Sequence, residues 1–200
     1  MHTTGTAGSY DWDFVIGRNI LEIYKCCFTG YRPSKLPFLN NKDGKDFIDF
    51  ENSIISVLTK LINENCIVFY TGMAMGFDII AAETVLLMKK IYKDKDIRLI
   101  SVLPFENQND SFDDEWKNRF NNIINNCDKK IILSQNYYKG CYQKRNRYMV
   151  DNSDFVITWF DGQKGGTKNT LDYAAKKKRQ IFNISKTQSD EYSFQEKIDI

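Results

Sequence analysis

Histidine is almost absent from this sequence, since the only one is His2, in a polar stretch at the start of the chain. Catalytic sets that pair a serine or cysteine nucleophile with a histidine base are therefore excluded from the body of the chain. The five cysteines include no CxxC pair, which argues against a zinc site. Their odd number, and the place of several inside apolar runs, indicate reduced, buried thiols in a cytoplasmic protein. We expect no metal and no cofactor.

Long hydrophobic runs are also missing. No apolar stretch approaches the roughly 20 residues that a membrane-spanning helix requires, and the first residues lack the layout of a secretory signal. A formal net charge of only +2 excludes a general binder of polyanions but leaves room for a local basic pocket. The sequence has no basic stripe with interleaved aromatic residues, which is the pattern that binds single-stranded nucleic acid. We therefore expect a small-molecule ligand, with neither a membrane nor a nucleic acid as partner.

Six short apolar runs alternate with segments of helical hydrophobic spacing. The apolar runs cover residues 23–28, 66–71, 97–104, 129–134, 154–160 and 180–185. The helical segments cover residues 46–63, 79–92, 112–126, 142–152 and 169–178. This alternation is typical of an open, doubly wound, mainly parallel sheet of about six or seven strands with helices on both faces. The sequence thus predicts an α/β domain over residues 23–185, an N-terminal extension (1–22) and a polar C-terminal tail (186–200).

Five glycines follow the predicted strands and come before, or near, a helix: Gly30, Gly72, Gly76, Gly165 and Gly166. Doubly wound sheets bind ligands beyond the carboxyl ends of their strands, where the strand order reverses. We therefore expect these glycines to lie along one edge of the sheet and to form a ligand site there.

The stretch TGMAMGFD, residues 71–78, places two of these glycines before an unbroken helical pattern. Glycine lets the backbone come close to a ligand, and a helix N-terminus offers unpaired N–H groups, so the loop suits a phosphate. Asp78 has two interpretations that the sequence leaves open. It can cap the helix or accept a hydrogen bond from a ribose hydroxyl.

The stretch DGQKGGTKNT, residues 161–170, is a second candidate cradle. Its glycines and the polar side chains of Thr167, Asn169 and Thr170 offer hydrogen-bond donors just before a helix, and Asp161 can accept from a sugar. The alternative is a glycine-rich turn that Thr167 or Asn169 caps.

The predicted helix over residues 142–152 is strongly basic. Arg145 and Arg147 diverge by about 200° on a helix, so they cannot serve one site equally. Lys144 and Tyr148 are four residues apart and share a face. An arginine can bind a phosphate with two hydrogen bonds, and the tyrosine can stack on a base. A solvated basic face is the alternative.

Taken together, four loops resemble the YpsA-like branch of the SLOG superfamily, which is named after the DprA/Smf proteins and the LOG cytokinin-activating hydrolases. They are CCFTGYRPSKLPF, TGMAMGFDIIAAE, LPFENQ and QKRNRYMVDNSDFVITWFDGQKGGTKNT. The resemblance covers residues 26–185 and implies a Rossmann-like fold, a nucleotide pocket at the strand ends, and assembly into a dimer or tetramer. Relatives include enzymes, DNA-binding proteins and sensors such as the SLOG domain of Thoeris effectors, which binds cyclic ADP-ribose isomers.

This resemblance implies a protein that binds a nucleotide-derived molecule, with ADP-ribose or a cyclic ADP-ribose-like signal as the sharpest candidate. Such a protein acts as a sensor, or in a phage or mobile element as a sponge that sequesters an immune signal. The predicted ligand-binding residues follow strands or lie in the basic helix: Thr29, Gly30, Arg32, Gly72, Met73, Ala74, Gly76, Asp78, Glu106, Arg145, Arg147, Tyr148, Asp161, Gly165, Gly166, Thr167, Asn169 and Thr170.

The alternative is an enzyme that cleaves or transfers the N-glycosidic bond of a nucleotide. LOG hydrolases carry P-G-G-x-G-T-x-x-E, and the matching stretch here is KGGTKNTLD. Lys168 replaces a glycine of that motif, and Asp172 stands where the catalytic glutamate is expected. Because a shorter side chain shifts the carboxylate, this difference argues against hydrolysis. Asp172, Glu106 and Glu83 are the candidate catalytic acids if the chain is nevertheless a hydrolase.

Overall fold

The structure is a computed structural model that describes residues 22–185. The predicted tail and nearly all of the predicted N-terminal extension lie outside this range. Within it, six strands alternate with five α-helices, as predicted. The strands are β1 (Tyr24–Thr29), β2 (Cys66–Thr71), β3 (Arg98–Leu103), β4 (Lys129–Ile132), β5 (Phe155–Thr158) and β6 (Gln180–Asn183). The α-helices are α1 (Lys45–Asn63), α2 (Phe77–Ile91), α3 (Asp114–Asn126), α4 (Cys141–Asp151) and α5 (Gly166–Lys176).

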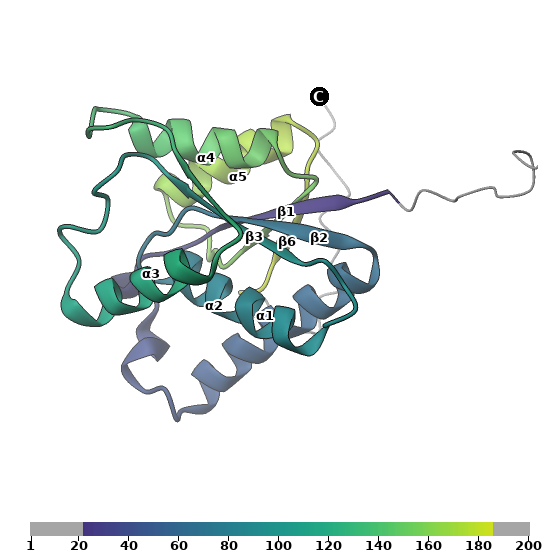
Figure 1. The fold of residues 1–200 in the computed structure, drawn as a ribbon. Helices are drawn as coiled ribbons and strands as arrows, with labels where there is room; N and C mark the ends of the chain where they lie inside the picture. Colours follow the sequence, from purple (N-terminus) through teal and green to yellow (C-terminus); the bar gives the residue numbers. More distant parts are fainter. Residues whose placement is uncertain (1–21, 186–200) are drawn as a thin grey trace, which may run out of the picture.

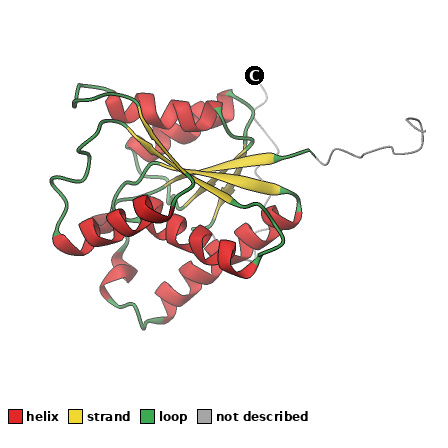
Figure 2. Ribbon diagram, viewed as in Figure 1, coloured by secondary structure: helices red, strands yellow, loops and turns green. Residues whose placement is uncertain are grey.

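All six strands run parallel, in the order β4-β3-β2-β1-β5-β6. The chain first builds outward from β1 to β4 and then crosses back to place β5 on the other side of β1. The strand order therefore reverses between β1 and β5. Helices α1, α2 and α3 cover one face of the sheet, and α4 and α5 lie side by side on the other (Figures 1 and 2). The predicted doubly wound, Rossmann-like α/β fold is confirmed.

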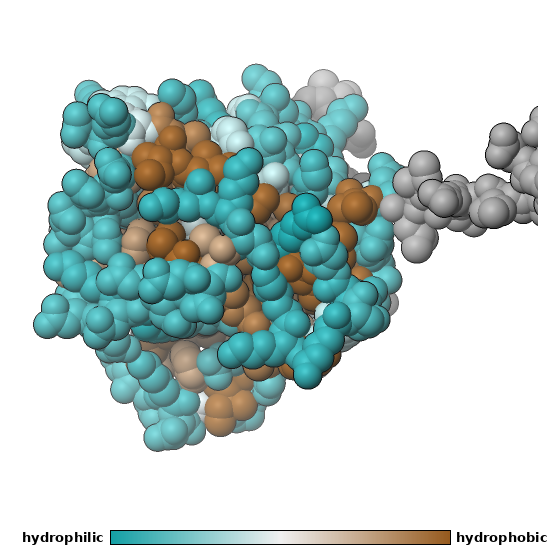
Figure 3. All heavy atoms as spheres, viewed as in Figure 1, coloured by the Kyte–Doolittle hydropathy of each residue, from teal (hydrophilic) through white to brown (hydrophobic). Residues whose placement is uncertain are grey.

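Apolar side chains fill the space on both faces of the sheet. On the side of α1 to α3, the rings of Phe28 and Phe69 stack with centroids 6.1 Å apart, and Phe77 packs edge-on against Phe28. A smaller cluster that includes Met149 and Val156 lies under α4 and α5. Burying each such side chain contributes about 1.5–3 kcal/mol. The face seen in Figure 3 is mostly hydrophilic, with hydrophobic residues showing in patches between hydrophilic ones.

The ends of some elements differ from the prediction. Strand β5 ends at Thr158, two residues before the predicted end, and α5 begins at Gly166, three residues before its predicted start. In the loop between them, Gly162 and Gly165 have φ values of 101° and 152°. Glycine adopts such angles without strain, so this loop leaves the sheet early and turns sharply into the helix.

Two short 3-10 helices follow β1, η2 (Pro33–Lys35) and η3 (Pro37–Asn40). Each begins at a proline, whose fixed φ suits the first position of a helix. Helices of three and four residues are too short to produce a periodic pattern of apolar residues, so the sequence did not predict them.

The turn between β2 and α2 requires glycine at position 76. The backbone there has φ 93° and ψ −128°, a conformation that other residues rarely adopt. A Cβ at Gly76 would overlap the main-chain oxygen of Tyr31, which accepts a hydrogen bond from the N–H of Phe77 at 3.1 Å. The turns after β1 and β2 therefore touch backbone to backbone.

We expect Gly76→Ala to lower the free energy of unfolding by about 3 kcal/mol or more, because the new side chain adds a steric overlap to a strained backbone. Gly140→Ala is the matched control. Gly140 has a similar φ of 97°, but a Cβ there would meet only the side-chain oxygen of Gln143, at 3.7 Å. The control should cost about 1–2 kcal/mol. Equal losses for the two variants in chemical denaturation would contradict the close contact between the turns.

Candidate functional site

A cavity of about 370 Å³ lies beyond the carboxyl ends of β1 and β5, where the strand order reverses. Open α/β sheets bind their ligands at this position. Its wall comes from the turn after β1, the loop before α2, the first turns of α4 and the start of α5. The residues that line the cavity are Thr29, Gly30, Tyr31, Arg32, Ser34, Lys35, Ala74, Asp78, Tyr142, Arg145, Asn146, Gly165, Gly166 and Thr167.

Basic side chains dominate the charge of this cavity. Arg32, Lys35 and Arg145 line it, and Asp78 is the one carboxylate among its lining residues. The side chains of Arg32 and Lys35 are exposed, whereas only 4% of Arg145 is exposed. The cavity therefore concentrates positive charge in an almost neutral chain, which is typical of a site for an anion.

Arg145 and Asp78 form the buried floor of the cavity. The Arg145 guanidinium donates a hydrogen bond to the main-chain oxygen of Gly72. Burial raises the pKa of Asp78, and the nearby guanidiniums of Arg145 and Arg32 and the N–H of Ala74 act in the opposite direction. Burial lowers the pKa of Arg145, against the attraction of the Asp78 carboxylate. Each of the two buried charges therefore depends on the other.

Gly72 belongs to this buried pair rather than to the cavity. Its main-chain oxygen accepts hydrogen bonds from Arg145 and from the side-chain amide of Gln108. A Cβ at Gly72 would overlap the guanidinium and lie 2.7 Å from Oδ2 of Asp78. The phosphate cradle predicted at Gly72 and Gly76 is therefore not found, because both glycines face packed groups of the protein.

Among the five glycines of the predicted site, those with free space around them are Gly165 and Gly166. A Cβ at either position would meet nothing within 4 Å, so a ligand can approach the N–H groups of the first turn of α5. Thr167 donates its hydroxyl to the main-chain oxygen of Gly30 at 3.0 Å, which fixes the helix start beside β1. Gly165 is the N-cap residue, so neither Thr167 nor Asn169 caps the helix. This N-terminus favours a negatively charged group.

Asp161 lies beside the cavity and does not line it. The hydroxyl of Tyr31 donates to the Asp161 carboxylate at 2.6 Å, and the N–H of Gln163 donates to it at 3.2 Å. The bond from Tyr31 lowers the pKa of Asp161. The carboxylate therefore ties the loop after β5 to Tyr31, whose ring lines the cavity.

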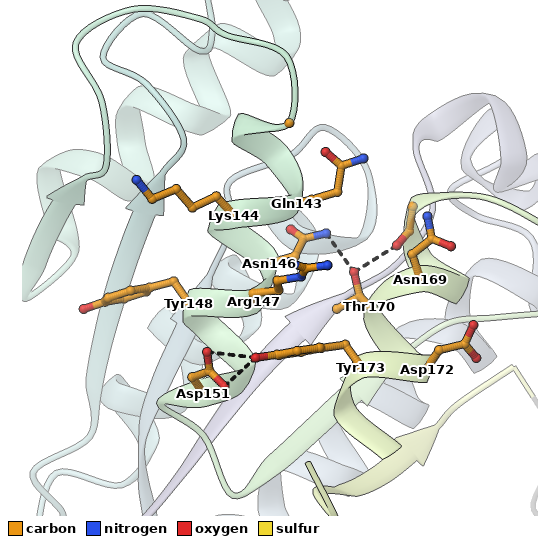
Figure 4. Close-up of a pocket in the computed structure, with 12 residues that line it drawn as sticks. Gln143, Lys144, Asn146, Arg147, Tyr148, Asp151, Asn169, Thr170, Asp172 and Tyr173 are labelled. Atoms are coloured by element: carbon orange, nitrogen blue, oxygen red, sulfur yellow. Dashed lines mark hydrogen bonds between the residues drawn. The ribbon is translucent and has the colours of Figure 1, made fainter. Parts of the chain in front are cut away.

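A wider groove of about 880 Å³ lies between α4 and α5 (Figure 4). There the guanidinium of Arg147 lies over the ring of Tyr173, 5.4 Å from its centroid. The hydroxyl of Tyr173 donates to Asp151 at 2.9 Å. Lys144 and Tyr148 share one face of α4, as their spacing predicts (Figure 4).

The groove and the cavity adjoin, because Asn146 and Gly166 line both. The side-chain amide of Asn146 donates to the hydroxyl oxygen of Thr170 at 2.8 Å (Figure 4). This bond ties α4 to α5 at the boundary between the two spaces.

The structure divides the predicted binding residues between these places. Nine line the cavity: Thr29, Gly30, Arg32, Ala74, Asp78, Arg145, Gly165, Gly166 and Thr167. Four others line the groove: Arg147, Tyr148, Asn169 and Thr170. The remaining five line neither space, since Gly72, Met73 and Gly76 are buried and Glu106 and Asp161 are exposed. Arg145 and Arg147 serve different spaces, as their divergence on a helix predicts.

Five residues of the cavity wall were not predicted: Tyr31, Ser34, Lys35, Tyr142 and Asn146. Tyr142 and Asn146 could have been found, because Tyr142 lies three residues before Arg145 and four residues before Asn146, the two spacings that make neighbours on a helix. The positions of Tyr31, Ser34 and Lys35 depend on the 3-10 helix that begins at Pro33. This helix is too short to leave a periodic pattern in the sequence.

The candidate catalytic acids stand apart from the cavity. Asp172 pairs with Lys168 at 2.7 Å on the surface of α5, and its carboxylate points away from α4 (Figure 4). Glu83 forms hydrogen bonds with Arg119 of α3. Glu106 is exposed in the loop after β3. None of these three side chains lines the cavity.

The cysteines are mostly buried, as the apolar runs around them predict. All five are free, and Cys127 alone is not fully buried. Burial raises the pKa of Cys27 to about 12, so its thiol is unreactive at neutral pH. Within residues 22–185, no group of three or more His, Cys, Asp or Glu side chains is placed to hold a metal ion. In the same range, no helix combines the length and the apolar character that crossing a membrane requires.

The sequence matches a protein-family model and several curated relatives. The YpsA model, described as the YspA SLOG family, matches residues 26–191. The uncharacterized SPbeta prophage-derived protein YoqJ of Bacillus subtilis is 32% identical over 142 residues, which cover 64% of this chain and 82% of YoqJ. A UPF0398 protein of Brevibacillus brevis is 26% identical over 164 residues, or 78% of this chain and 86% of the relative.

Solved structures of DNA processing protein A (DprA) share the fold. The chain is 20% identical to the Streptococcus pneumoniae protein, with a TM-score of 0.55, over 82% of this chain and 50% of the other. It is likewise 20% identical to the Helicobacter pylori protein, with a TM-score of 0.51, over 80% of this chain and 64% of the other. This chain therefore spans one half to two thirds of the DprA chains, and the likeness concerns the fold alone.

We expect the buried pair to be strongly coupled in a double-mutant cycle of Asp78→Asn and Arg145→Met. Each single change leaves a buried charge without its partner and should lower the free energy of unfolding by about 3–5 kcal/mol. The double variant should lose about 1–3 kcal/mol less than the sum of the two. The exposed pair of Lys168 and Asp172 is the control, with an expected coupling below about 0.5 kcal/mol. A coupling near zero for the buried pair, measured by denaturation, would contradict this account of the cavity floor.

Proposed function

The chain belongs to the YspA SLOG family, and from this membership and the cavity we propose that it binds a small nucleotide-derived molecule through its phosphate. ADP-ribose or one of its cyclic isomers is the ligand that we propose. The protein then acts as a sensor or as a sequestering protein that holds its ligand without chemical change.

One observation carries this proposal, namely the meeting of three cations and an open helix N-terminus in one cavity. Arg32 and Lys35 come from the turn after β1, Arg145 comes from α4, and the free space lies at Gly165 and Gly166 of α5. Cations and unpaired N–H groups are the two kinds of partner that bind phosphate oxygens best. A phosphate at this point neutralises part of the excess positive charge.

The size of the site supports a small ligand. A volume of about 370 Å³ lies at the low end of the range for small-molecule pockets. The related DprA structure from Helicobacter pylori is described with a single-stranded DNA binding mode, but a net charge of +2 gives this chain little attraction for a polyanion. The adjoining groove leaves room for a second sugar or phosphate, as ADP-ribose requires.

The placement of the carboxylates supports binding without turnover. Cleavage of an N-glycosidic bond needs a carboxylate beside the developing oxocarbenium ion and a proton donor for the leaving base. Asp172 is paired with Lys168 outside the cavity, and the cavity's own carboxylate, Asp78, is buried beside Arg145. Asp78 is therefore held among protein groups, and Asp172, which lines the adjoining groove, lies on the exposed surface of α5 outside the cavity in which we place the phosphate.

We expect Arg32→Ala to weaken the binding of ADP-ribose by about tenfold to a hundredfold, because a charged hydrogen bond is worth about 1.5–3 kcal/mol. Titration calorimetry measures this change. Arg98→Ala is the matched control, because Arg98 is also exposed and pairs with Asp96 at the opposite end of the strands. Unchanged affinity in Arg32→Ala would move the phosphate away from the turn after β1. Absence of binding of ADP-ribose, its cyclic isomers and AMP to the unsubstituted protein would overturn the proposed function.

We also expect no free adenine or nicotinamide after overnight incubation of the protein with AMP, ADP-ribose and NAD. Chromatography of the products checks this. Asp172→Asn serves as the comparison, since it removes the acid that the LOG motif would require. Release of base that disappears in this variant would replace the binding function by hydrolysis.

A further inference from the structure

Three aromatic rings form a cluster beside the cavity, although they come from separate parts of the chain. Phe105 follows β3, Tyr137 follows β4, and Tyr142 lies in the first turn of α4. The centroid of Phe105 is 5.7 Å from that of Tyr137 and 5.9 Å from that of Tyr142, and both pairs are edge-to-face. The two tyrosine rings are 6.3 Å apart. Each ring thus contacts the other two.

The cluster borders the cavity through Tyr142. Tyr142, Arg145 and Asn146 follow helical spacing on α4, and all three line the cavity. Tyr142 and Arg145 therefore border the same space. Strands β3 and β1 are separated only by β2, so their ends lie about 10 Å apart. A nucleotide with its phosphate near β1 is long enough to reach the rings near β3.

The exposure of Tyr137 is unusual for a ring whose only role is packing, and Phe105 and Tyr142 are half-buried beside it. Tyr137 has 64% of its surface exposed, although it contacts two other rings. It lies in a run of six exposed residues, 135–140. An exposed aromatic face next to a basic cavity offers a nucleotide base a surface on which to stack.

We propose that Phe105, Tyr137 and Tyr142 form a subsite for an aromatic base, so that the site selects nucleotides over sugar phosphates. This inference rests on the proposed function, because the phosphate in the cavity places the base. It also moves the base away from Tyr148, which lines the groove between α4 and α5, to Tyr142, which lines the cavity.

The test compares AMP with ribose 5-phosphate, two probes that differ only by the base. Tyr137→Ala removes an exposed ring and leaves the folded core untouched. We expect it to weaken the binding of AMP by about fivefold to a hundredfold, the usual effect of removing one stacking ring. The binding of ribose 5-phosphate should stay unchanged. Tyr142→Ala should weaken the binding of AMP by more than it changes the binding of ribose 5-phosphate, because Tyr142 also lines the cavity, and Tyr142→Phe should restore the AMP affinity because it keeps the ring.

Tyr138→Ala is the matched control. Tyr138 is the adjacent exposed residue, but its ring is paired with the ammonium of Lys144, 6.0 Å from the centroid, and not with the cluster. It should leave both affinities unchanged.

Two results would overturn the base subsite while the phosphate site stands. One is AMP affinity that stays unchanged in Tyr137→Ala and Tyr142→Ala. The other is an equal loss of both probes, since the rings then shape the cavity without contacting a base. Failure of the proposed function has a different signature, because the unsubstituted protein then binds neither probe.

Discussion

A single buried guanidinium, that of Arg145, joins the two faces of the sheet at the edge where we propose the ligand site. Helix α4 covers one face of the sheet, and the loop from β2 to α2 leads to the opposite face. The bond from Arg145 to the Gly72 carbonyl and the attraction of Asp78 fix the first turns of α4 over the strand ends. A buried charge without a partner costs several kcal/mol, so this connection holds α4 in place. Tyr142 and Asn146 are held with it, because they lie on the same face of the helix. The cavity wall depends on it.

Glycine serves two different purposes along this edge. At Gly72 and Gly76 the missing side chain lets protein groups approach the backbone, a guanidinium in one case and a carbonyl oxygen in the other. At Gly165 and Gly166 the space that a side chain would take is empty. The first pair holds the loops together, and the second pair leaves the helix N-terminus accessible. The same residue type thus builds both the wall and the opening of the site.

The fold and the family could be predicted from the sequence, and both predictions are confirmed. Strand and helix periodicities are local, and the parallel order follows from their alternation, so every predicted strand and helix is present in the described chain. The role of each loop residue is not local. A glycine between a strand and a helix looks the same in sequence whether a ligand or the guanidinium of a distant helix lies against it, so the cradle at Gly72 was misplaced. Helical spacing correctly separated Arg145 from Arg147, yet it could not tell which of them faces inward. The structure shows that Arg145 is the one that faces inward, because it is buried and bonded to Gly72. Tyr142 and Asn146 line the cavity with it.

The charge of the cavity links the phosphate binding that we propose to the absence of glycosidic cleavage that we expect. Three cations and one carboxylate line the space, and the carboxylate is buried, where it feels the charge of the Arg145 guanidinium and accepts a hydrogen bond from the N–H of Ala74. A phosphate enters this field favourably and relieves the repulsion of Arg145 by Arg32, which lowers the pKa of Arg145. A sugar that loses its base develops positive charge at the anomeric carbon. The same cations oppose that charge, and the acids that could stabilise it, Asp172 and Glu83, are paired with cations elsewhere. Only interactions that are stronger in the transition state than in the ground state accelerate a reaction. The site that we propose binds the phosphate equally in both states, so we expect it to hold its ligand intact.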